Sequence, residues 1–232
     1  MENEERHTRG RTARRTRPLD VLSYHQTSRV PPRGTPVRSL VLPPWRFALQ
    51  LRALKLLGWQ GLSMRDLEPY LHGEKKGKVF GITLDDGYVN NYEHALPVLR
   101  ALGFTATSFI VTGQIGGSNV WDHPQGAPAV PLMDVQQLRG WMDAGMEIGA
   151  HTRNHVNLLN CDDATAREEI VGSKRDLEQL EDGFLQTQEL NKQLREELER
   201  LKAIKEAHYT ATPPPADPNE AITRELYINL LL

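Results

Sequence analysis

The sequence predicts an α/β fold in which parallel strands alternate with crossover helices. From residue 19 to about residue 180, strand and helix patterns alternate in units of roughly thirty residues, the length of one strand–helix–strand unit. The strand candidate Val79–Leu84 is almost wholly apolar, as is typical of a parallel strand buried on both faces. Polar motifs directly follow this strand and the strand at 146–150. Parallel α/β folds hold their active sites at such strand ends.

About four strands and five helices are expected in this region. Alternation and apolar runs predict strands at 19–25, 79–84, 106–112 and 146–150. Helical spacing of apolar residues predicts helices at 47–57, 64–71, 90–102, 134–145 and 162–180. Capping residues support these boundaries, with Ser63 and Asp134 before their helices and Gly103 after one. Residues 26–44 and 113–131, rich in turn-forming residues, read as loops.

The N-terminal residues 1–17 are expected to form a disordered basic tail. Six arginines lie in this segment, but no apolar stretch follows Arg14 and Arg15, so no signal peptide is visible. No aromatic residue is interleaved with the arginines, which argues against a nucleic-acid-binding arm. The compartment in which the protein works is left open.

The C-terminal part of the chain differs in kind from the α/β region, which we place at residues 18–183. Residues 184–208 are expected to form a helix, and residues 209–232 a Pro-rich linker followed by a short helix. Heptad positions between Leu177 and Lys205 are mostly apolar, with Asn191 at an a position, as in coiled coils. A homo-oligomer through residues 177–206 is one interpretation, and a single solvated helix is the other.

Bulk composition excludes some classes of protein. The net charge of −2 gives no indication of a polyanionic partner. The sequence contains no run of 18 apolar residues, so no membrane-spanning helix is expected. The single cysteine rules out an internal disulfide, which fits either a reducing compartment or a disulfide-free exported protein.

Asp85 and Asp86 form a pair of carboxylates at the end of the strand at 79–84. Neighbouring carboxylates on an extended chain diverge, so one can bind a metal while the other takes a proton from water. The alternative is an ordinary polar turn, because Asp-Gly is a common turn signal.

His151 and His155 follow the strand at 146–150 with a spacing of four residues. If this segment starts a helical turn, both imidazoles lie on one face and can bind one cation. Two histidines and one carboxylate are a common ligand set for catalytic zinc. The alternative is a pair of surface histidines in a loop.

Taken together, these motifs resemble those of the polysaccharide deacetylase family, the NodB-homology carbohydrate esterases. Thr83-Leu84-Asp85-Asp86-Gly87 is similar to the family's first motif, with Leu84 where Phe is usual, and His151-Thr152-Arg153-Asn154-His155 matches its second. The resemblance covers about residues 19–183 and is greatest to the branch that acts on poly-N-acetylglucosamine. Flanking segments that agree with this branch are Tyr24-His25-Gln26, the helix at 50–58, Ala106-Thr107-Ser108-Phe109 and 145–150.

The resemblance implies a partial, distorted parallel β/α barrel with a C-terminal helical extension. It also implies a metal-dependent hydrolase that removes N-acetyl groups from a polysaccharide. Asp86, His151 and His155 would hold a divalent ion such as zinc, and Asp85 would act as the catalytic base. Tyr88 and Trp121 are candidates to line a sugar-binding cleft, with ordinary packing as the alternative.

The sequence departs from the family pattern after Gly183. The later motifs, a Pro-Tyr-Gly segment and a Leu-x-His that supplies the general acid, have no match, and His208 lies in no such context. A genuine variant and a truncated reading frame are both compatible with this departure. Three functions therefore remain: an active deacetylase, an inactive remnant that binds metal or glycan, and a coiled-coil interaction protein.

Overall fold

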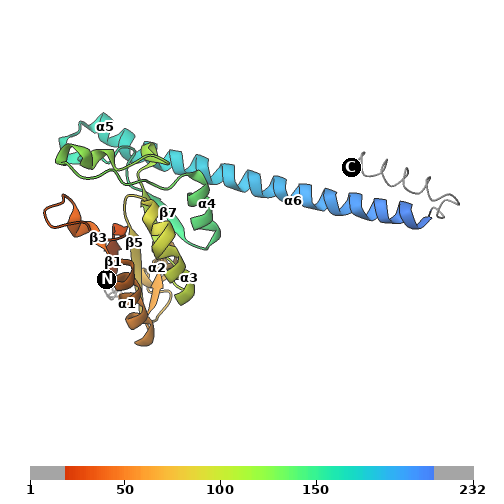
Figure 1. The fold of residues 1–232 in the computed structure, drawn as a ribbon, viewed down its shortest axis with the longest axis horizontal. Helices are drawn as coiled ribbons and strands as arrows, with labels where there is room; N and C mark the ends of the chain where they lie inside the picture. The colour runs from red at the N-terminus through yellow and green to blue at the C-terminus, as the bar shows by residue number, and fades with distance from the viewer. Residues whose placement is uncertain (1–18, 212–232) are drawn as a thin grey trace, which may run out of the picture. The chain divides into compact units, whose positions relative to one another are not determined.

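The computed structural model describes residues 19–211 of the chain, with side chains up to residue 206 (Figure 1). The chain divides into two compact units, the first ending at Leu180 and the second beginning at Glu181. The predicted basic tail at 1–17 and nearly all of the predicted Pro-rich segment at 209–232 lie outside the described residues.

The first unit is built on a five-stranded, all-parallel sheet, which confirms the predicted fold class. Four strands lie in the order β1 (Val21–Tyr24), β5 (Val79–Leu84), β6 (Thr107–Ile110) and β7 (Glu147–Ala150). The fifth, β4 (Gln60–Leu62), pairs with the first half of β5, and its Gly61 O accepts a hydrogen bond from the N–H of Thr105, two residues before β6. It was not predicted because it has only three residues, with a glycine in the middle.

A second sheet of two short strands lies within the predicted loop at 26–44. It pairs β2 (Gln26–Thr27) with β3 (Val41–Leu42).

The helices lie close to their predicted positions, and the caps are those expected. Ser63 accepts a hydrogen bond from Asp66 N–H, and Asp134 forms a capping box with Gln137. The main helices are α1 (Pro44–Leu56), α2 (Met64–Leu71), α3 (Leu96–Leu102), α4 (Val135–Asp143), α5 (Asp163–Arg167) and α6 (Ser173–Ala211). Two single π-helical turns interrupt the pattern, η2 (Asn91–Ala95) before α3 and η6 (Glu168–Gly172) between α5 and α6. Shorter 3-10 turns are η1 (Arg38–Leu40), η3 (Thr112–Gln114), η4 (Val120–Gln125) and η5 (Leu158–Asn160).

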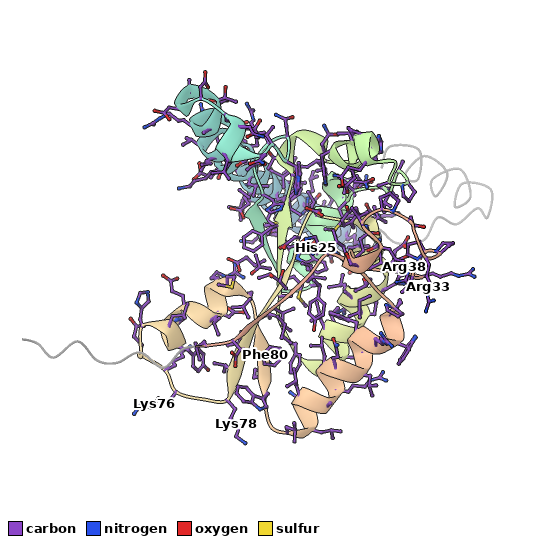
Figure 2. The ribbon with its side chains drawn as sticks, turned by 90° about the vertical axis from the view of Figure 1, so that its left-hand side faces the viewer. His25, Arg33, Arg38, Lys76, Lys78 and Phe80 are labelled. Atoms are coloured by element: carbon purple, nitrogen blue, oxygen red, sulfur yellow. The ribbon has the colours of Figure 1, made fainter. Side chains whose placement is uncertain are left out.

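Helices cover both faces of the sheet. On one face, Ile82 of β5 belongs to a buried cluster with Leu51 of α1 and Leu99 of α3. On the other face, Gly81 leaves room for Leu67 of α2, since a Cβ at Gly81 would lie 3.1 Å from Leu67 Cδ2. Figure 2 shows α1 and α3 on one side of the strands and α2 on the other. Burial on both faces explains why β5 is almost wholly apolar.

The barrel is partial within residues 19–211, as the family resemblance implied. There, β1 pairs only with β5, and β7 pairs only with β6, so both strands form open edges of the sheet. None of the described helices is both long and apolar enough to cross a membrane.

The second unit contains the later part of α6, which agrees with the predicted helix at 184–208. Along this part the large apolar side chains are mostly exposed, with exposures of 40–63% at Leu185, Leu190, Leu194, Leu198, Leu201 and Ile204.

Candidate metal centre

The polar motifs of the first unit meet at one edge of the sheet. Leu84 of β5 pairs with Tyr24 of β1, so the residues that follow these strands lie level with each other. His151 follows β7, whose pairing with β6 places it at the same edge. Figure 2 shows His25 towards this edge, whereas Lys78, just before β5, lies at the opposite end of the sheet.

Asp86 is turned into the protein by an unusual backbone conformation. Its φ is +70°, in the left-handed region, and Gly87 follows with φ +78°. Asp tolerates this region better than most residues, and glycine adopts it without penalty. A Cβ at Gly87 would lie 3.0 Å from Ile110 Cδ1, so the turn also has little space for a side chain. As a result, the Asp86 carboxylate is only 3% exposed.

Three possible metal ligands converge on one point. Asp86 Oδ1 lies 3.4 Å from His151 Nε2 and 3.2 Å from His155 Nε2, and the three ligand atoms lie within 4.8 Å of one another. Despite these short distances, Asp86 Oδ1 has no well-aligned hydrogen-bond donor among the described residues. A buried acceptor is rarely left in this state, and a divalent cation at the shared point would satisfy it. The residues therefore fit a metal ion.

The segment that carries the two histidines is a loop and not the helical turn that their spacing would also allow. Thr152 has φ +62° and His155 has φ +56°, both in the left-handed region. The backbone is instead fixed by neighbouring segments, since Thr112 N–H donates to Thr152 O and Gly113 N–H donates to Arg153 O. The two imidazoles therefore converge because tertiary contacts bend the loop.

The close approach of the groups changes the acidity of Asp86 and of His155. Burial alone would raise the pKa of Asp86, but the neighbouring imidazoles of His151 and His155 outweigh it and hold that pKa well below its usual range. In return, the Asp86 carboxylate raises the pKa of the His155 imidazole, against the lowering effect of burial. The opposite directions of these two shifts are those of an ion pair between Asp86 and His155.

Asp85 lies beside this cluster but is not one of its three members. Its side chain is 18% exposed, and its Oδ2 accepts a hydrogen bond from Ser23 Oγ at 3.0 Å. The two neighbouring carboxylates thus have different partners.

His25 is a residue of this edge to which the sequence analysis gave no role. Its Nε2 lies 3.9 Å from Asp85 Oδ2, and its side chain is 31% exposed. The backbone of His25 is anchored by Asn91, whose Nδ2 donates to His25 O at 2.7 Å. In the structure His25 directly follows β1, as Asp85 follows β5 and His151 follows β7.

The two aromatic candidates have different environments. Tyr88 is fully buried, so its ring offers no face to a sugar, and the expectation that it lines a cleft is not supported. Burial and the nearby Asp86 carboxylate raise the pKa of the Tyr88 hydroxyl. Trp121 is half-buried and stacks on His155, with ring centroids 4.5 Å apart and planes 19° apart.

A cavity of about 380 Å³ opens beside the imidazoles. The apolar side chains of Val156, Leu158 and Leu159 form part of its wall, so a ligand in it would lie next to the candidate metal position. The lining residues are His151, Thr152, His155, Val156, Asn157, Leu158 and Leu159.

Comparison with known proteins identifies the family. Residues 72–189, which contain all three candidate metal ligands, match the polysaccharide deacetylase family. This chain belongs to the polysaccharide deacetylase family.

Two curated relatives agree with this assignment. This chain is 29% identical over 159 residues to YxkH of Bacillus subtilis, a candidate polysaccharide deacetylase. The aligned region covers 68% of this chain and 50% of YxkH. It is 28% identical over 118 residues to the poly-β-1,6-N-acetyl-D-glucosamine N-deacetylase of Staphylococcus aureus, covering 49% of this chain and 37% of that protein. The chain thus spans half or less of the length of these relatives.

Solved structures support the same fold. The Streptococcus pyogenes deacetylase PplD, in complex with acetate, superposes with a TM-score of 0.58 at 26% identity, covering 70% of this chain and 68% of PplD. IcaB from Ammonifex degensii has a TM-score of 0.55 at 24% identity, covering 70% of this chain and 69% of IcaB. The partial barrel therefore has the architecture of this deacetylase family.

Proposed function

We propose that this chain is a metal-dependent hydrolase that removes N-acetyl groups from an N-acetylglucosamine-containing polysaccharide. The observation that carries the proposal is the convergence of His151 and His155 on the buried Asp86 Oδ1, which has no well-aligned hydrogen-bond donor among residues 19–206. The substrate class is supported by the Staphylococcus aureus relative, whose name specifies poly-β-1,6-N-acetylglucosamine.

Asp86, His151 and His155 would hold the metal, for which we propose zinc. Two imidazole nitrogens and one carboxylate oxygen form a common catalytic zinc set that leaves a position open for water or substrate. A divalent ion there would lower the pKa of water and polarise a carbonyl group.

Asp85 would act as the general base. Its carboxylate lies beside the metal ligands, is partly exposed, and is held by the Ser23 hydroxyl. It would take a proton from the attacking water, whose oxygen bonds to the carbonyl carbon of the N-acetyl group. The carbon–nitrogen bond then breaks, giving acetate and an amine on the sugar.

His25 would give the leaving nitrogen its proton. The observation behind this role is the 3.9 Å separation between His25 Nε2 and Asp85 Oδ2, which puts a partly exposed imidazole beside the proposed base. Acid–base groups at such positions typically contribute about 10²–10⁴-fold to rate. His25 and Asp85 would therefore act as a proton-donor and proton-acceptor pair.

Trp121 would contribute to the sugar site through the part of its ring that is not covered by His155. Its partial exposure beside a metal ligand supports this role. The cavity beside His151 and His155 supplies the space for a substrate group.

The activity is tested by incubating the purified chain with poly-β-1,6-N-acetylglucosamine oligomers and zinc, and measuring acetate release. We expect release that stops when a chelator is added and returns when zinc is restored. Tight zinc binding without acetate release would instead favour a remnant that binds metal or glycan without turnover.

A second proposal concerns the later part of α6, which would pair with a second copy of the chain as a parallel coiled coil. Exposed Leu194, Leu198 and Leu201 lie at heptad core positions, which favours this proposal. In a parallel pair, Glu197 of one copy and Lys202 of the other would stand at complementary flanking positions. Mass measured by sedimentation should rise with protein concentration, and Leu198→Asp should abolish the rise. A constant monomer mass would favour the single solvated helix.

A further inference from the structure

We propose that Glu169 is a positioning residue that holds the loop 151–155 in the shape needed to bind the metal. The inference rests on the proposed metal site but concerns a residue outside it. Glu169 lies in η6, the π-helical turn between α5 and α6, and reaches the loop from the side. It is not one of the three candidate metal ligands.

The Glu169 carboxylate accepts three hydrogen bonds from this loop. Its Oε2 accepts from Arg153 N–H and from Asn154 N–H, both at 2.9 Å, and its Oε1 accepts from Asn154 Nδ2 at 2.7 Å. Glu169 is only 6% exposed, which is unusual for a carboxylate. A buried charge with three hydrogen bonds to one short segment fixes the position of that segment.

The bonds are made where the loop needs support. Arg153 and Asn154 lie between Thr152 and His155, the two residues with positive φ. A left-handed conformation costs about 1–2 kcal/mol for a residue other than glycine. Such conformations persist only when the surrounding structure over-determines them. The three bonds from Glu169 provide this restraint at the middle of the loop.

The shape of η6 fits this role. A π-helical turn inserts one extra residue into a helix and is often found at functional sites. Gly172, in the same turn, lies against the loop, because a Cβ there would come within 2.8 Å of Arg153 Cδ. The turn therefore places the Glu169 carboxylate and the backbone of Gly172, which has no side chain, against the loop.

The chemistry requires a carboxylate in particular. Glutamate offers two acceptor oxygens, whereas glutamine offers one oxygen and a donor nitrogen. In Glu169→Gln the remaining side-chain oxygen can keep the two bonds from the loop backbone. The new amide nitrogen would face the donor Asn154 Nδ2 and could not accept its hydrogen bond. Glu169→Ala would lose all three bonds. The two variants should therefore be affected to different degrees.

Glu168, the preceding residue, provides a matched control. Its side chain is 55% exposed and pairs with the guanidinium groups of Arg153 and Arg175, not with the loop backbone. Glu168→Gln thus removes a carboxylate from the same turn but leaves the backbone of the loop restrained.

The test measures zinc binding to the full chain by calorimetry, with the absorption spectrum of bound Co²⁺ as a second readout. Residues that orient metal ligands typically change metal affinity by about 10–100-fold. We expect a loss of this size in Glu169→Ala, a smaller loss in Glu169→Gln, and none in Glu168→Gln. The cobalt band of Glu169→Ala should also shift, which a loss of stability alone would not produce.

Two results would overturn the inference, and they can be told apart. If the unaltered chain binds zinc and Glu169→Ala binds it equally well with the same cobalt spectrum, the positioning role is wrong and the metal site stands. If the unaltered chain binds no zinc, the proposed function fails and this inference falls with it.

Discussion

Asp86 Oδ1 lies 3.2 Å from His155 Nε2, although Asp86 follows β5 and His155 lies in the loop after β7. The parallel sheet brings these two segments to one edge, and left-handed backbone conformations at both residues turn their side chains towards each other. The buried Asp86 Oδ1 lacks an aligned hydrogen-bond donor among the described residues. The geometry of this pair therefore suits the binding of a cation better than a direct hydrogen bond.

The two neighbouring carboxylates should be separable by mutation. Asp86→Asn should weaken zinc binding by more than about 100-fold, because it removes the charge of a direct ligand and even indirect partners are worth about 10–100-fold. Asp85→Asn should leave zinc affinity nearly unchanged and lower the rate of acetate release by about 10²–10⁴-fold. Calorimetry and an acetate assay on both variants check this. Equal zinc affinities in the two variants would contradict the assignment of Asp86 as metal ligand and Asp85 as general base.

His25→Gln should lower turnover without altering the metal site. Loss of the proton donor is expected to reduce the rate by about 10²–10⁴-fold, while zinc affinity stays as it was. His72→Gln is the control, since His72 is a largely exposed histidine paired with Glu68 on α2. Full activity in His25→Gln, measured by acetate release at saturating substrate, would assign the proton to another group.

Stability and metal binding should depend on pH in opposite ways. The raised pKa of His155 gives the metal-free chain stability that is present below the usual histidine value and lost as pH rises through the raised one. The lowered pKa of Asp86 gives stability that is present above the usual aspartate value and lost as pH falls. This pair therefore stabilises the metal-free protein most between about pH 4 and pH 6.5.

Zinc should reverse the upper part of this profile. Zinc binds neutral imidazole, so its affinity should increase as pH rises through the raised pKa of His155. Thermal unfolding at several pH values, with chelator and with zinc, measures both effects. A zinc-induced gain in stability that is the same at pH 5.5 and pH 8 would contradict the assignment of His155 as a ligand.

Gly113→Ala should disturb the ligand loop directly. A Cβ at Gly113 would lie 2.6 Å from Arg153 O, so the loop backbone would have to shift. We expect a destabilisation of about 1–3 kcal/mol, together with weaker zinc binding. Gly183→Ala is the matched control: apart from the backbone of α6 itself, no described atom lies within 4 Å of its Cβ position, so it should stabilise the helix by about 0.5–1 kcal/mol. Denaturant unfolding and calorimetry distinguish the two variants.

The sequence predicted which residues meet, but not how the backbone brings them together. The placement of Asp86 and His151 follows from apolar strands and parallel topology, and both can be read from local patterns. The bend of the 151–155 loop depends on Glu169 and Gly113, which come from other segments and leave no local signal. The spacing of the two histidines would fit one face of a helical turn, whereas the structure brings them together through positive φ values.

Other differences have similar physical reasons. Tyr88 was a candidate cleft residue because an aromatic face suits a sugar ring, yet it is fully buried, and Leu132 pairs with it in an isolated bridge. The strand β4 is too short for a periodic pattern, and its pairing to β5 is set by the sheet. His25 was overlooked because a single histidine carries no spacing that would indicate chemistry.

The most direct test of the account is zinc binding by the purified chain, measured by calorimetry against an Asp86→Ala/His151→Ala double variant. We predict tight binding of one zinc ion per chain that is lost in the double variant, because these side chains supply two of the three converging ligand atoms. Absence of binding by the unaltered chain, or equal binding by the double variant, would contradict the assignment of this cluster as the metal centre.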